Sequence, residues 1–171
     1  MNARHTSSQA QGMILIHSAS AALCPHIEWA LGSALGKRVE LDWIPQPAEA
    51  GARRAEYSWD GAVGTGAVLA SALTKIGHLR FEVTEEPSSG ADGQRYCFTP
   101  ALGAFTAVTG IHGDILVPED RLRHAAATDA LGGEPLHLAL ERLLGVPWDE
   151  ELDVFRHAAE DAPVRWLHQV V

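Results

Sequence analysis

Met13-Ile-Leu-Ile16 is the stretch that decides the fold, because its continuous apolarity is typical of a central strand covered on both faces. Six segments with strand or helix periodicity alternate from it along the first half of the chain: Met13–Ser18, Pro25–Gly36, Arg38–Ile44, Arg54–Trp59, Ala62–Gly77 and Leu79–Thr84. Two strand–helix–strand units in tandem predict an α+β fold with a ferredoxin-like split βαβ core (βαββαβ). Strand order 4-1-3-2 would place the apolar strand in the middle.

The two predicted helices differ in their outer faces. In the first, an apolar stripe faces the sheet, and His26, Trp29 and Ser33 fall together on the opposite side. The second has no charge between Asp60 and Lys75, and a helix without charge all round is usually buried on two sides. We therefore expect the second half of the chain to cover these helices.

The second half supplies further strands and a helical, acidic extension. Its expected elements are a hairpin of Arg95–Thr99 and Ala104–Thr109, a short strand at Asp114–Val117, a helix after Pro118, a helix within Glu134–Leu144, a helix opened by Asp149, and a strand with alternating Val164, Trp166, His168 and Val170. We expect a disordered tail at residues 1–11 and one domain at residues 12–171. Within that domain, residues 12–86 form the core and residues 87–171 pack on it.

Composition limits the class of protein. The apolar fraction of 46% and the charged fraction of 20% are those of a soluble globular chain. The net charge of −9 lies mostly within residues 118–162, and no basic stripe offers a path for nucleic-acid phosphates. No apolar run is long enough for a membrane span or a signal peptide, so we expect a cytoplasmic protein that binds neither membrane nor nucleic acid. Two cysteines fit a reducing compartment.

His17, Cys24 and His26 are the candidate catalytic residues, because they gather between the first strand and the first helix. A thiol near a helix N-terminus can have a lowered pKa and act as a nucleophile. The simpler interpretation makes Cys24 a small buried apolar residue. No Cys/His spacing of a zinc site occurs, so we expect no metal and no cofactor.

Gly64, Thr65 and Gly66 are the candidate ligand-binding residues, since N–H groups at a helix N-terminus can hold an anion. The alternative is that small residues let this helix approach a neighbour closely. The carboxylates of the extension are expected to point into water: Asp149, Glu150, Glu151, Asp153, Glu160 and Asp161.

Four separated motifs carry a family resemblance: Cys24-Pro-His-Ile-Glu-Trp-Ala30, Arg95-Tyr-Cys-Phe-Thr-Pro100, Gly113-Asp-Ile-Leu-Val-Pro-Glu-Asp-Arg-Leu122 and Pro163-Val-Arg-Trp-Leu-His168. With them the chain resembles, from Met13 to Val171, an uncharacterised actinobacterial family, domain of unknown function 3145. The resemblance implies a cytoplasmic actinobacterial protein. It implies no activity and no catalytic residue.

Three functional hypotheses follow. The first is a non-enzymatic regulatory or scaffolding protein that binds a protein partner, through His26, Trp29 and Ser33, or a small metabolite. The second is an enzyme that acts on a small or acyl substrate in a cleft between the core and the extension. The third is a homodimer joined through the open sheet face or the second helix, which light scattering tests. In each case we look for the site where the extension meets the core.

Overall fold

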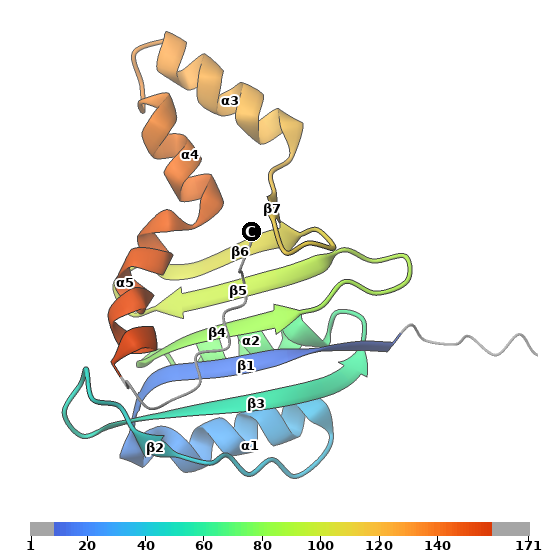
Figure 1. The fold of residues 1–171 in the computed structure, drawn as a ribbon, viewed down its shortest axis with the longest axis vertical. Helices are drawn as coiled ribbons and strands as arrows, with labels where there is room; N and C mark the ends of the chain where they lie inside the picture. The colour runs from blue at the N-terminus through green and yellow to red at the C-terminus, as the bar shows by residue number, and fades with distance from the viewer. Residues whose placement is uncertain (1–8, 159–171) are drawn as a thin grey trace, which may run out of the picture.

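A seven-stranded antiparallel sheet forms the centre of the computed structural model, which describes residues 9–158 (Figure 1). Its strands lie in the order β2-β3-β1-β4-β5-β6-β7. Their bounds are Gln9–Ser20 for β1, Ile44–Pro45 for β2, Ala52–Ala62 for β3, Leu79–Glu85 for β4, Gly93–Thr99 for β5, Gly103–Thr109 for β6 and Ile115–Leu116 for β7. The helices are α1 (Cys24–Leu35), α2 (Thr65–Thr74), α3 (Glu119–Ala130), α4 (Leu136–Leu144) and α5 (Val146–His157), with a 3-10 turn, η1, at Ala21–Leu23.

The central position of β1 confirms the strand order predicted for the first four strands. β1 pairs antiparallel with β3 on one side and with β4 on the other. A Cβ at Gly12 would lie 1.8 Å from the carbonyl oxygen of Thr84, so only glycine permits this approach of β1 to β4. Gln9–Gln11, which the sequence placed in the N-terminal tail, instead form the start of β1.

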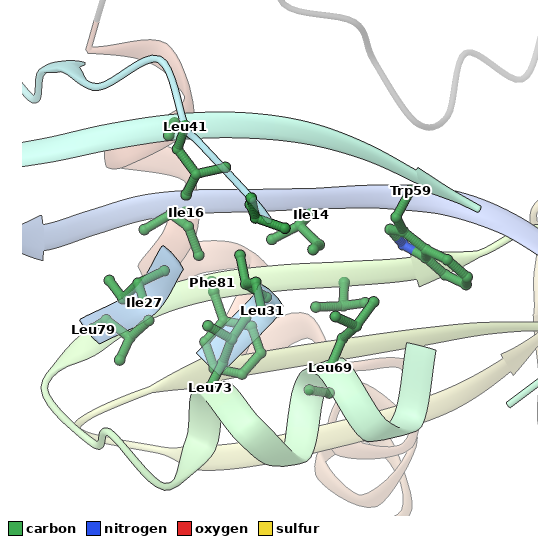
Figure 2. Packing of buried hydrophobic residues seen from close by; sticks show 14 of the residues in the cluster. Ile14, Ile16, Ile27, Leu31, Leu41, Trp59, Leu69, Leu73, Leu79 and Phe81 are labelled. Carbon is green, nitrogen blue, oxygen red and sulfur yellow. The ribbon is translucent and has the colours of Figure 1, made fainter. Parts of the chain in front are cut away.

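The main hydrophobic core lies between the sheet and the helices α1 and α2 (Figure 2). Alternate residues of β1 and β4 point toward these helices, where they meet Ile27 and Leu31 of α1 and Leu69 and Leu73 of α2. α1 ends as predicted, because Gly36 takes the left-handed conformation (φ 65°) and caps it. The two helices also contact each other, and Ala70 of α2 is buried.

The predicted strand at Arg38–Ile44 is wrong, because only Ile44 and Pro45 pair with β3. Val39 and Leu41 are buried as the alternation indicated. The backbone N–H of Leu41, however, donates to Oε1 of Glu28 on α1 at 2.9 Å rather than to a strand. The indole of Trp43 donates to the same oxygen at 3.0 Å. A side chain of α1 thus takes the place of a strand neighbour.

The C-terminal half covers the opposite face of the sheet from the one expected. β5 and β6 form the predicted hairpin and extend the sheet beyond β4. α3 and α4 stand out from the sheet edge, and α5 returns across the face that α1 and α2 leave open (Figure 1). Within residues 9–158, Trp29 of α1 and Val68 of α2 therefore stay exposed, at 76% and 53%.

Up to residue 158, the extension thus packs on the sheet face opposite α1 and α2 and not, as the sequence led us to expect, over these two helices. The outer surface of α2 consists of small uncharged side chains, and α2 also contacts α1, so this surface can face solvent. By contrast, Leu152 of α5 is apolar and is buried against the sheet. The predicted strand at Val164–Val170 and the carboxylates of Glu160 and Asp161 lie outside the described residues. Across residues 9–158, no helix combines the length and apolarity that a membrane crossing requires.

Candidate functional site

A cavity of about 770 Å³ lies on the sheet face opposite α1 and α2, and we call it the open-face groove. Its floor includes Met13 and Leu15 of β1 and Arg54 of β3, and one end is walled by Arg156 and His157 of α5. Met13, Leu15 and Arg54 occupy the alternate positions of β1 and β3 that point away from the hydrophobic core. The groove therefore lies where the strands of the core meet the C-terminal extension.

At that end of the groove, Glu82 of β4 is the centre of a buried cluster of charges. Its side chain is 3% exposed and accepts hydrogen bonds from Arg95 of β5 at 2.7 Å and from Arg156 of α5 at 2.6 and 3.1 Å. His17 of β1 lies 2.6 Å from its Oε2 through Nε2. Because an ionised carboxylate only accepts, Nε2 of His17 carries the proton that it donates. Asp149 of α5 accepts from both arginines and completes the Glu82 cluster.

The cluster fixes the ionisation of its central carboxylate. Burial by itself would raise the pKa of Glu82, but the hydrogen bond and charge of His17 and the charges of Arg156 and Arg95 outweigh it and hold that pKa well below 4.5. Two guanidinium groups and the imidazole of His17 thus face two carboxylates. Each guanidinium and each carboxylate has a partner of opposite sign, and the cluster is buried around Glu82 and partly exposed at Asp149.

A second group of contacts ties α5 to the sheet beside the Glu82 cluster. Arg80 of β4 bridges Glu49 and Glu151, both at 3.2 Å, and its guanidinium lies 4.4 Å from the centre of the Phe155 ring. Thr99 of β5 donates to Oε2 of Glu151 at 2.7 Å. These contacts and the Glu82 cluster fix the helix that walls the groove.

Local sequence explains how α5 presents both apolar and charged groups to the sheet. Asp149, Leu152 and Arg156 are spaced i, i+3 and i+7, and therefore share one face of the helix. Leu152 is fully buried in a small cluster with Cys97 and Phe105.

A bulge on β1 lies at His17, because the pairing of this strand with both neighbours shifts register just after Ile16. Bulges commonly re-aim a side chain next to a site.

The three candidate catalytic residues do not come together. His17 lines the groove and belongs to the Glu82 cluster, whereas Cys24 and His26 line no part of it. Partial burial and the carboxylate of Glu28 raise the pKa of Cys24, which is the opposite of what its place at a helix N-terminus predicted. Cys97, which the sequence did not single out, is buried, and burial together with Glu82 raises its pKa as well. Both thiols are therefore poor nucleophiles near neutral pH.

The candidate anion site at the start of α2 already holds a carboxylate of the same chain. The backbone N–H groups of Gly64 and Gly66 each donate to Glu85 at 2.8 Å, one to each carboxylate oxygen. A Cβ on Gly66 would lie 2.9 Å from Oε2 of Glu85, which explains the small residue there. Thr65 begins the helix between these two donors.

The candidate partner-binding residues are exposed as the helical periodicity predicted. His26, Trp29 and Ser33 all lie on the outer face of α1, on the side of the molecule away from α5. They line no part of the groove. The described part of the chain offers no group of three His, Cys, Asp or Glu side chains placed to hold a metal ion.

Residues 13–169 match the family model described as "Protein of unknown function (DUF3145)". The chain belongs to the DUF3145 family. The matched range contains every residue of the Glu82 cluster and the floor of the groove at Met13 and Leu15. No curated protein and no solved structure matches the chain.

Sequence reasoning missed most of the residues that form the site of this DUF3145 chain. Glu82 and Arg95 were hidden in the polar half of strand alternations, which normally marks a solvated face. Asp149 was interpreted as a solvated carboxylate, but it is paired with two arginines. The spacing of Asp149, Leu152 and Arg156 along the sequence could have indicated the site, because it places the three residues on one face of a helix. A buried leucine between two opposite charges indicates that the charges also meet the sheet.

Proposed function

We propose that the chain is a non-enzymatic regulatory protein that binds a small metabolite in the open-face groove. The observation that carries this proposal is a cavity of about 770 Å³ in which two arginines, Arg95 and Arg156, are already paired with the carboxylates of Glu82 and Asp149. The Glu82 cluster gives this end of the groove a rigid wall, while Met13 and Leu15 offer an apolar floor. Pockets that combine an apolar surface with a few fixed polar groups are typical of small-molecule sites.

A ligand screen with a filled groove tests the proposal. The variant Leu15→Trp places a large ring in the groove, and Leu138→Trp, at an exposed position of α4, is the matched control. We expect a binding metabolite to raise the melting temperature of the wild type and of Leu138→Trp, but not of Leu15→Trp. Equal shifts in all three proteins, or no shift with any metabolite, would overturn the proposal.

The enzyme hypothesis keeps one observation in its favour, because His17 lines the groove and contacts a carboxylate at 2.6 Å. A histidine oriented by a carboxylate can act as a general base. Against this, the carboxylate of Glu82 also accepts from two arginines, so it is shared among three donors and is not dedicated to His17. If the enzyme hypothesis holds, NMR of a bound metabolite will show turnover that His17→Asn abolishes while binding persists. Unchanged metabolite after long incubation with the wild type favours the binding protein.

Three finer expectations from the sequence are part of the same proposal. The order β4-β1-β3-β2 with antiparallel pairing supports a ferredoxin-like arrangement of residues 12–86. The two free cysteines, one of them buried, support a reducing, cytoplasmic location. The exposed Trp29 supports a protein partner on the face away from the groove.

A further inference from the structure

Arg54 differs from the other arginines of the open-face groove because its guanidinium group forms a long ion pair with Glu56 and leaves one nitrogen without a hydrogen-bond partner among the described residues. The residue is 7% exposed, and its Nη1 is buried without a hydrogen-bond partner in the described part of the chain. Its Nη2 lies 3.6 Å from Oε1 of Glu56, too far for a hydrogen bond. By contrast, Arg95 and Arg156 each donate to both Glu82 and Asp149.

The unsatisfied nitrogen of Arg54 lowers the stability of the folded protein when no ligand is bound. A buried guanidinium nitrogen that has given up water without gaining an acceptor destabilises the folded state. Arg54 lines the cavity, so its guanidinium group is the donor that an acceptor brought by a ligand can approach from the groove. The guanidinium fork matches a carboxylate in particular, since two parallel N–H groups can bind its two oxygens.

An apolar path leads away from Arg54 along the sheet. Residues 54, 56 and 58 of β3 share one face, and the register places Leu15 opposite Glu56 and Met13 opposite Ser58. From Arg54 to Ser58 this path is about 13 Å long, at about 3.3 Å per residue. Leu15 and Met13 line the groove along it.

We propose that Arg54 is the anchor of the open-face groove and that the ligand is a monocarboxylate whose apolar chain lies over Leu15 and Met13. This inference rests on the proposed function and names the chemical class of its ligand. A single negative charge fits better than a phosphate, because the groove is lined by three arginines but five carboxylates: Glu56, Asp60, Glu82, Glu86 and Asp149. A dianion would be repelled by that surplus, while one carboxylate at Arg54 meets a local positive charge.

Three probes with the same chain and different head groups test the anchor on the full-length protein: octanoate, octanol and octylamine. We expect octanoate to raise the melting temperature and to bind about tenfold more tightly than octanol, since a charge-assisted bidentate pair is worth about one such factor or more. Octylamine should not bind. If octanol binds as well as octanoate, the carboxylate anchor is wrong, although an apolar groove that binds ligands survives.

The variant Arg54→Met distinguishes an anchor from a structural residue. Without ligand we expect it to melt at or above the wild-type temperature, because it removes an unsatisfied buried donor. It should lose the response to octanoate, while Arg38→Met, at a position whose side chain is 87% exposed, keeps that response. A lower melting temperature for Arg54→Met without ligand would show that Arg54 stabilises the fold, and would overturn the inference.

A final variant tests whether the chain itself supplies the carboxylate. Glu160 and Asp161 follow α5 by a few residues and lie outside the described part of the chain, so the double variant Glu160→Gln, Asp161→Asn removes two carboxylates whose partners the structure does not describe. We expect it to bind octanoate as the wild type does. If it instead loses stability and gains affinity for octanoate, Arg54 serves those carboxylates and the ligand anchor is refuted. If no octyl compound binds while a metabolite from the screen does, the anchor fails and the proposed function stands.

Discussion

Replacing Glu82 by glutamine is the sharpest test of how α5 is held on the sheet. The substitution keeps the size of the side chain but removes the carboxylate that joins Arg95, Arg156 and His17. It also turns an acceptor into an NH₂ group that faces donors. Removing one partner of a buried ion pair costs about 3–5 kcal/mol, because the remaining charge stays desolvated.

The structure places this variant near the lower end of that range. Asp149 still accepts from both arginines in Glu82→Gln, and its side chain is 39% exposed, so water can reach part of the cluster. We therefore expect a loss of about 3 kcal/mol. With an m-value of about 2 kcal/mol/M in urea, the midpoint of unfolding should fall by about 1.5 M.

Urea unfolding followed by circular dichroism measures this loss, and Glu40→Gln is the control. Glu40 forms an ion pair with Arg38 at 2.7 Å, but both side chains are more than 70% exposed. Such surface pairs contribute about 0–1 kcal/mol, so the control should unfold close to the wild type. A loss below about 1 kcal/mol for Glu82→Gln would refute the reasoning, because the cluster would then not be a desolvated network.

The same cluster predicts a dependence of stability on pH. The pKa of Glu82 is depressed in the folded protein, so the unfolded state binds a proton more readily. This contribution is complete above the unfolded pKa of about 4.5 and is lost as pH falls through the folded pKa. We expect wild-type stability to fall below about pH 4.5 more steeply than that of Glu82→Gln. Parallel pH curves would contradict this assignment.

Three further predictions concern other parts of the fold. Gly66→Ala should lower the free energy of unfolding by about 1–3 kcal/mol, because its Cβ would displace Glu85 from two backbone donors, and urea melts measure it. Trp29→Ala should change the free energy of unfolding by less than about 0.5 kcal/mol, because the Trp29 side chain is exposed. A larger loss would show that Trp29 packs against another part of the protein. Iodoacetamide followed by mass spectrometry should label Cys24 before Cys97, which is buried, and the reverse order would contradict that burial.

Hydrophobic periodicity was sufficient for most of the architecture. The continuous apolarity of Met13–Ile16 identified the strand that has neighbours on both sides, and the Gly36 cap identified the end of α1. These features are local, because they depend on the spacing of apolar side chains and on one backbone conformation. The strand at Arg38–Ile44 failed because Glu28, distant in sequence, took the hydrogen bond that a strand would have needed.

The candidate site depended on tertiary structure to a greater extent. Alternation alone assigns Glu82 and Arg95 to a polar face, and it does not say whether that face meets water or a helix. The sequence of this chain determined most of its strands and its two core helices. Only the packing of α5 decided that Glu82 is buried among arginines, since the effect of a charge depends on which partners and how much water the fold places beside it.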